Sequence, residues 1–136
     1  IYQQYVETGL VRFGYQHFAF LGAESQWAAE ASECASDQDA FWEYHDLLFA
    51  KQSGENGGAF GKQNLKQFAA ELGLNTGAFG ECLDSGQHAA AVKSQTEYLQ
   101  SLGVSSTPAF LINGQPIIGA QSFEAFQKII EQELNK

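Results

Sequence analysis

Two cysteines are the side chains best suited to redox or nucleophilic chemistry. Cys34 and Cys82 are the only cysteines in the sequence, and they can form a disulfide, remain free thiols or act as a catalytic dithiol. A reactive thiol needs an electropositive environment that stabilises its thiolate. The sequence supplies the opposite, because acidic residues lie close to both cysteines: Glu33, Asp37, Glu81 and Asp84. The catalytic interpretation is therefore the least favoured of the three.

The three histidines are the candidates for metal binding. His17 lies on an expected strand, His45 on an expected helix and His88 at the start of another helix. A metal site would require them to converge with each other or with Cys34, and their spacing matches no ligand motif. We therefore expect no metal site and no cofactor. We expect His45 to be an ordinary, hydrogen-bonded residue of the helical region.

The composition indicates a globular domain and excludes some classes of partner. The chain has 136 residues, of which 44% are hydrophobic and 13% aromatic, which suffices for one domain with a core. Its formal net charge of −9, from 16 acidic and 7 basic residues, argues against nucleic-acid binding. The chain contains no methionine and begins at Ile1, so we expect it to be a mature form or a fragment of something longer.

Hydrophobic periodicity predicts a strand, a block of helices, a hairpin and a final helix. Residues 11–18 alternate between apolar and polar side chains, which is typical of a strand. Apolar residues at helical spacing predict helices over 24–36, 37–52, 62–72, a short segment capped by Asn75, 87–102 and a segment from about Ser122. Strands near both ends with helices between them indicate an α/β domain that carries a helical insertion.

The hairpin follows a proline. Asn113-Gly114 separates the apolar runs AFLI and QPII, and Asn-Gly is a strong signal for a two-residue hairpin turn. Pro108 directly precedes the first run. Because proline has no N–H to donate, it belongs at the start of a strand or on an edge strand. From these residues alone, an ordinary trans Pro108 at an edge strand is the favoured interpretation.

Three segments of the chain resemble the DsbA-like thiol–disulfide oxidoreductases of the thioredoxin superfamily. The segments are GVSSTPAFLINGQPIIGAQSFEAFQKII, AAEASECASDQDAFWEYHDLLF and LGLNTGAFGECLDSG. They occur in the order that the family has, and the resemblance covers nearly the whole chain. It implies a thioredoxin-like α/β fold in which residues 23–102 form an inserted helical domain. Residues 1–22 and 103–136 would then form the thioredoxin-fold part.

The resemblance also implies a substrate site and a cellular location. Ser106, Thr107 and Pro108 would form the cis-proline loop, whose backbone pairs with an extended peptide. The implied partners are protein or peptide substrates with thiols or disulfides, together with a redox partner protein. The implied location is extracytoplasmic, in the periplasm or cell envelope. Disulfides persist there, so a structural bond between Cys34 and Cys82 becomes the favoured interpretation, and it would stabilise the fold by about 4 kcal/mol.

The C-x-x-C motif on which the chemistry of this family depends is absent from the sequence. The first central strand of the sheet is absent as well, so we assign no catalytic residue. Two functions stay open: an oxidoreductase whose C-x-x-C lies upstream of Ile1, and a redox-inactive thioredoxin-fold module that binds a peptide or partner. The rest of a longer chain, or a segment swapped from a second copy, would fill the gap in the sheet. An isolated monomer of these residues is therefore expected to fold poorly.

Overall fold

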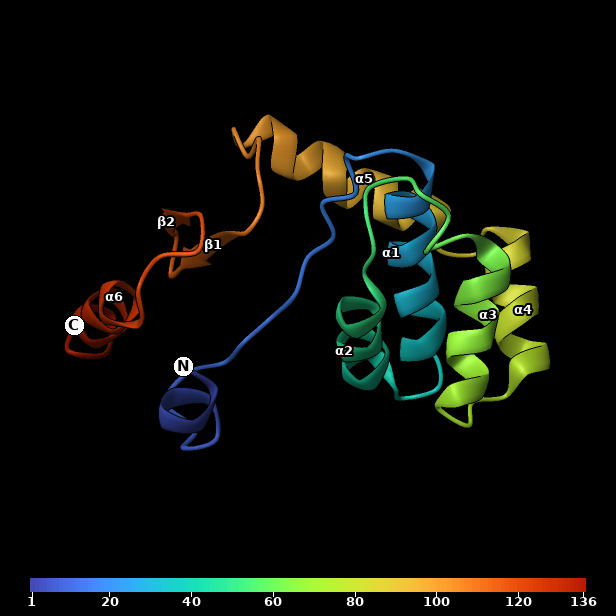
Figure 1. The fold of residues 1–136 in the computed structure, drawn as a ribbon. Helices are drawn as coiled ribbons and strands as arrows, with labels where there is room; N and C mark the ends of the chain where they lie inside the picture. Colours follow the sequence, from blue (N-terminus) through green and yellow to red (C-terminus); the bar gives the residue numbers. More distant parts are fainter. The chain divides into compact units, whose positions relative to one another are not determined.

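The computed structural model describes all 136 residues and divides the chain into two compact units (Figure 1). The helical unit comprises His17–Leu99. The hairpin unit comprises Ile1–Gln16 together with Gln100–Lys136. Most of the range 23–102, for which an inserted domain stays a prediction, lies within the helical unit. None of the helices combines the length and the hydropathy that a membrane span requires.

Five helices account for most of the helical unit, and α1 is the one against which α2, α3 and α4 pack. Their bounds are α1 Ala23–Ser36, α2 Phe41–Lys51, α3 Lys62–Glu71, α4 Thr76–Ser85 and α5 Ala89–Ser101. The predicted helices are therefore present, each with ends close to those that the periodicity indicated. The glycine-rich segment 53–61, which connects α2 to α3, contains no helix or strand before Lys62.

A single apolar core holds α1 to α4 together. Tyr44 on α2 is fully buried, and its hydroxyl donates a hydrogen bond to the Leu65 carbonyl at 2.8 Å. The Tyr44 ring lies 5.4 Å from that of Phe79, measured between centroids. The other buried members of this core are Ala31, Cys34, Ala35, Ala40, Leu65, Phe68, Ala69, Cys82 and Leu83. Burial of this surface, at about 25 cal/mol per Å² of apolar area, is the main stabilising contribution in the unit.

The ends of α4 follow from the residues that stand there. The Asn75 side chain accepts a hydrogen bond from the Ala78 N–H at 3.0 Å, as expected for an N-cap. Gly86 ends the helix with φ of 66°, a left-handed conformation that favours glycine. Gln38, just after α1, exchanges two hydrogen bonds with the Asn75 backbone. The start of α4 is thereby fixed to the end of α1.

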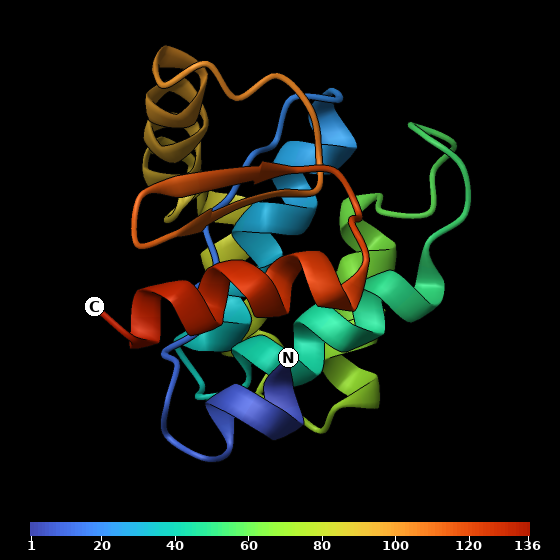
Figure 2. The ribbon, with the colours of Figure 1, turned by 90° about the vertical axis from the view of Figure 1, so that its left-hand side faces the viewer.

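The hairpin unit is built from two short strands and two helical segments. The strands β1 (Ala109–Ile112) and β2 (Gln115–Ile118) pair antiparallel with Ala109 opposite Ile118, and they form a two-stranded sheet. Asn113 and Gly114 both have positive φ, 48° and 87°, which is the geometry of the predicted two-residue turn. Helix α6 (Phe123–Leu134) is capped by Ser122 and lies beside the hairpin (Figure 2).

A second, smaller core lies between the hairpin, α6 and the short π-helix Tyr2–Val6. Phe110 of β1 and Phe126 of α6 meet edge to face with ring centroids 4.8 Å apart. The Tyr5 hydroxyl donates a hydrogen bond to Glu131 at 2.9 Å. Burial and this carboxylate both raise the pKa of Tyr5. The last helix therefore fixes both the hairpin and the amino-terminal segment.

The predicted strand over residues 11–18 is not present. These residues have no helix or strand assignment. The His17 N–H donates to the Gln95 side chain at 3.0 Å, and the Ala19 N–H donates to the Thr96 hydroxyl at 3.0 Å. An alternating pattern predicts an extended backbone, but a strand also needs a neighbouring strand with which to form a ladder. Side chains of α5 take the place of such a neighbour near His17.

Candidate functional site

The loop before β1 contains the residues that the sequence assigned to substrate binding. Ser106, Thr107 and Pro108 are all exposed, and β1 begins at the next residue. The Thr107–Pro108 peptide bond is cis, whereas the residues alone favoured trans. The Gly119 N–H, just after β2, donates to the Pro108 carbonyl at 2.8 Å. The loop is therefore joined to β1 by the chain itself and to the residue after β2 by this hydrogen bond.

The strand that follows this loop has an unused pairing edge. β1 pairs with β2 alone, so no strand of this chain pairs with its second edge. Such an edge presents alternating N–H and C=O groups to which an extended peptide can add. Ser106 to Pro108 lie at the point where a peptide along this edge would begin or end. The arrangement can therefore bind an extended chain through main-chain hydrogen bonds.

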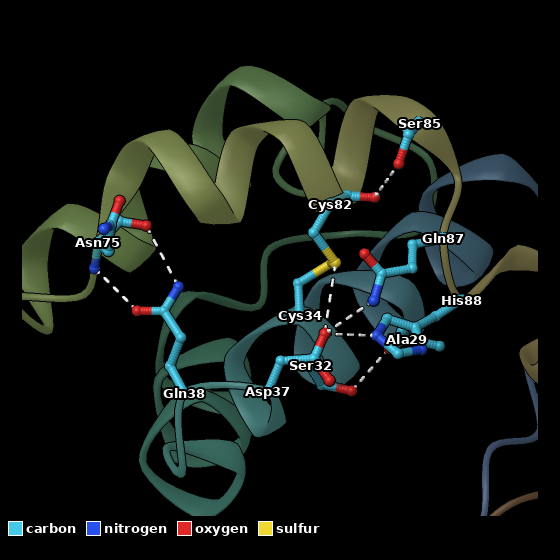
Figure 3. Close-up of a disulfide and its surroundings, with 10 residues drawn as sticks. All are labelled: Ala29, Ser32, Cys34, Asp37, Gln38, Asn75, Cys82, Ser85, Gln87 and His88. Atoms are coloured by element: carbon cyan, nitrogen blue, oxygen red, sulfur yellow. Dashed lines mark hydrogen bonds and ion pairs between the residues drawn. A yellow bond between two sulfur atoms is a disulfide. The ribbon is translucent and has the colours of Figure 1, made fainter.

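Cys34 and Cys82 form a disulfide in the structure (Figure 3). Cys34 lies on α1 and Cys82 on α4, with their Cα atoms 5.9 Å apart. The two residues are only 1% and 8% exposed. Thiol–disulfide exchange requires an attacking thiolate to approach a sulfur in line with the bond. Because burial restricts that approach, the geometry favours the structural interpretation of this pair over the catalytic one.

One carboxylate connects the disulfide to a histidine. Asp37 Oδ2 lies 2.7 Å from His88 Nε2 and 3.3 Å from the Gln87 amide nitrogen, which donates to it. The same oxygen lies 3.7 Å from Cys82 Sγ (Figure 3). A sulfur in a disulfide carries no hydrogen, so this last approach is a contact and not a hydrogen bond. Asp37 therefore contacts both the histidine and the disulfide.

His88 does converge with the cysteines, which corrects the expectation that it would not. One ring nitrogen of His88 and the two sulfurs all lie within 4.8 Å of one another. The cause is tertiary: the disulfide joins the two helices near their ends, and the turn at Gly86 folds His88 back towards Cys82. The available signal in the sequence was a cysteine and a histidine on either side of a glycine that stops a helix. Linear spacing of metal ligands does not reveal it.

The other two histidines lie outside this cluster. His17 is buried, and its Nε2 lies 2.6 Å from Glu33 Oε1. His45 Nδ1 lies 3.0 Å from Asp46 Oδ1 on the same helix, so His45 is hydrogen-bonded in the helical region as predicted. Each histidine therefore has its own carboxylate, and only the carboxylate of His88 also contacts a cysteine.

We compared the sequence with known protein families and with individual proteins. The sequence matches the family described as "Thioredoxin" over residues 1–132. It is 27% identical over 144 residues to Disulfide bond formation protein D of Bacillus subtilis (strain 168), covering 98% of this chain and 62% of that protein. It is 33% identical over 122 residues to Na(+)/H(+) antiporter NhaA 1 of Salinispora arenicola (strain CNS-205), covering 88% of this chain and 18% of that protein. The chain thus spans less than two thirds of the length of either relative.

Comparison with solved structures indicates a thioredoxin-like fold, in agreement with the sequence match. The structure superposes on the crystal structure of Wolbachia pipientis alpha-DsbA1 with a TM-score of 0.81 and 18% identity, covering 98% of this chain and 73% of that one. The expected thioredoxin-like fold with inserted helices is therefore confirmed, here with a sheet of two strands. Because the family model matches nearly the whole chain, the chain belongs to the thioredoxin family.

Proposed function

We propose that this chain is the larger part of a thiol–disulfide oxidoreductase that exchanges disulfides with extracytoplasmic protein substrates. The observation that carries the proposal is the family match over residues 1–132, together with the likeness to a protein named for disulfide bond formation. The relative is longer than the region that aligns. We therefore place the C-x-x-C motif in a part of the protein outside the present 136 residues.

In this proposal the loop at Ser106, Thr107 and Pro108 orients the substrate. An extended segment of the substrate adds to the open edge of β1 and brings its cysteine to the C-x-x-C. Exposure of the three loop residues and the unpaired edge of β1 support this role. Main-chain pairing gives affinity without a strong sequence requirement, which suits an enzyme that acts on many unfolded chains.

The reaction would be ordinary disulfide exchange. A substrate thiolate attacks the C-x-x-C disulfide and forms a mixed disulfide, and one C-x-x-C sulfur leaves as a thiolate. A second substrate thiolate then attacks the mixed disulfide, so the substrate gains a disulfide and the enzyme is left as a dithiol. A redox partner reoxidises that dithiol. Cys34 and Cys82 take no part in these steps, and their bond serves to hold α1 to α4.

The test begins with the coding sequence upstream of the Ile1 codon, where we expect a strand-forming stretch followed by C-x-x-C. The longer protein should accelerate the reduction of insulin by dithiothreitol, and replacing both C-x-x-C cysteines by serine should abolish this. The double variant Cys34→Ala with Cys82→Ala is the matched control and should retain turnover. The 136-residue chain alone should show none above background. Turnover by this chain alone, or loss of turnover in a control variant whose circular dichroism shows that it is folded, would contradict the assignment of roles.

A redox-inactive module that binds a peptide or a partner is the alternative. The absence of C-x-x-C from these 136 residues favours it. Under this alternative the upstream sequence lacks the motif, and the longer protein binds extended peptides without any turnover of insulin. A strand-swapped dimer, in which a second copy fills the gap in the sheet, would then give a dimeric mass in sedimentation experiments.

A further inference from the structure

We propose that reduction of the Cys34–Cys82 disulfide creates a binding site for zinc or a similar thiophilic divalent cation. Cys34, Cys82 and His88 would supply the ligands, and Asp37 would act as the positioning residue for the histidine. The disulfide and the metal would then be alternative occupants of the same pair of sulfurs. The proposal concerns the helical unit alone and is independent of any C-x-x-C chemistry.

The distances already suit such an ion. The three ligand atoms lie within 4.8 Å of one another. In a tetrahedral zinc site, Zn–S bonds of about 2.3 Å and Zn–N bonds of about 2.1 Å put neighbouring ligand atoms roughly 3.5 to 3.8 Å apart. Opening the disulfide allows its two sulfurs to move to that separation by rotating about their Cα–Cβ bonds. The helices that carry them need not rearrange.

The surroundings of His88 resemble those of a metal-binding histidine. Such a histidine usually bonds through its second ring nitrogen to a carboxylate, which fixes the orientation of the ring. His88 Nε2 lies 2.7 Å from Asp37 Oδ2, and Gln87 donates to the same oxygen at 3.3 Å. Gln87 therefore helps to hold the Asp37 carboxylate that bonds to the imidazole. Because Nε2 makes that bond, Nδ1 would be the ring nitrogen that binds the cation.

The charges around the reduced pair favour a cation. Two thiolates would lie beside the Asp37 carboxylate, in a chain whose net charge is −9. A divalent cation relieves this repulsion and makes the thiolates the stable form. An ion also has a way in, because the Asp37 side chain is 44% exposed while the sulfurs behind it are buried.

The chemical steps balance without an unnamed reagent. An external dithiol or phosphine supplies two electrons, the S–S bond breaks, and each sulfur takes up one proton. A dithiol reductant becomes a disulfide, and a phosphine becomes its oxide with oxygen from water. The metal then displaces both thiol protons and forms two metal–sulfur bonds. An added disulfide oxidant that takes up two electrons re-forms the Cys34–Cys82 bond and becomes a dithiol. This oxidation must release the metal, because the disulfide sulfurs no longer bind it as thiolates.

Cobalt(II) is the probe of choice, because thiolate ligation gives it charge-transfer bands and a tetrahedral site gives it intense visible bands. The 136-residue chain, reduced anaerobically with a phosphine, should bind one Co²⁺, and Zn²⁺ should displace it. The oxidised chain should show no such bands. We expect His88→Ala to weaken binding at least tenfold and Asp37→Asn to weaken it by roughly 10- to 100-fold. His45→Ala, which alters a histidine outside the cluster, is the matched control and should leave the affinity unchanged.

The proposal is overturned if the reduced chain, with both thiols titrated as free, shows no cobalt–thiolate bands. It is also overturned if His88→Ala binds as tightly as the wild type, because thiols in an unfolded chain would bind cobalt without that histidine. Circular dichroism measures whether the chain unfolds on reduction. If helix content falls when the disulfide opens, zinc must restore it in the wild type and restore it less well in His88→Ala. Failure to restore it rejects the site.

Discussion

Tyr44 combines an apolar ring with one polar atom inside the helical core. Its ring packs near Phe79, and its hydroxyl donates to the Leu65 carbonyl. Burial raises the pKa of Tyr44 far above its usual range near 10. A folded-state pKa above the unfolded one means that the stabilising contribution is complete below about pH 10. That contribution is lost as the pH rises towards the folded-state pKa.

Replacing Tyr44 by Phe should therefore lower the free energy of unfolding by about 1–3 kcal/mol at neutral pH, because the Leu65 carbonyl loses its buried donor. The variant should also lose less stability than the wild type between about pH 9 and 11. Urea unfolding at several pH values, with the disulfide intact, measures both effects. Tyr2→Phe, at an exposed tyrosine, is the control. Equal pH dependence in Tyr44→Phe and the wild type would contradict this account.

For single residues, the sequence predicted the roles that depend on neighbours along the chain. It did not predict the roles that depend on contacts between distant segments. Acidic neighbours of Cys34 and Cys82 already argued against a catalytic thiol, and the structure adds the Asp37 contact. The approach of His88 to these cysteines was not predictable, because it depends on how α4 turns at Gly86 and on which helix lies opposite. Spacing along the chain contains neither piece of information.

At the scale of single elements, the capped helix α4 shows how a terminus is specified. The Asn75 side chain satisfies one of the N–H groups that no helical carbonyl can reach. We expect Asn75→Ala to cost about 1 kcal/mol of stability. Asn75→Asp keeps an oxygen acceptor at the cap and should cost much less. Thermal unfolding of the three proteins measures the difference, and equal losses in both variants would show that the side-chain bond contributes little.

The helices and the hairpin were predictable because their signals are local. Asn113-Gly114 specifies its turn through two backbone conformations, and Asn75 and Ser122 specify helix starts through one hydrogen bond each. Residues 11–18 failed as a strand for the opposite reason. Their alternation fits an extended backbone, but the partner that would complete a ladder is not a local property. The hydrogen bonds from His17 and Ala19 to α5 side chains could not be read from the pattern.

At the scale of the whole molecule, the two units differ in what holds them together. The helical unit has the larger buried core and the disulfide. The hairpin unit has a smaller core that joins two separate stretches of chain, the amino-terminal residues and those from Gln100. Stability therefore need not be uniform along the chain, since local opening is easiest where few apolar contacts resist it. The expectation that an isolated monomer of these 136 residues folds poorly stays a prediction.

Limited proteolysis of the oxidised chain should leave a resistant fragment that covers most of His17–Leu99. Sites in the hairpin unit should be cut first, because their protection depends on the smaller core. Mass spectrometry of the early fragments identifies the order of cleavage. Reduction of the disulfide should make the helical unit more sensitive and thus serves as the control. Early loss of α1 or α4 while β1, β2 and α6 survive would contradict this ranking.

The bond between α1 and α4 closes a covalent ring that contains α2, α3 and the glycine-rich segment 53–61. A single break in the backbone anywhere on this ring leaves the protein in one piece, because the remaining arc still joins both sides. The exposed residues of 53–61 lie on this ring and are themselves tied to the start of α1, where Glu24 accepts a hydrogen bond from Gly58. This segment is therefore where we expect the domain to tolerate an inserted sequence. It is also where a circular permutant could have its new termini, because the disulfide keeps the four core helices linked.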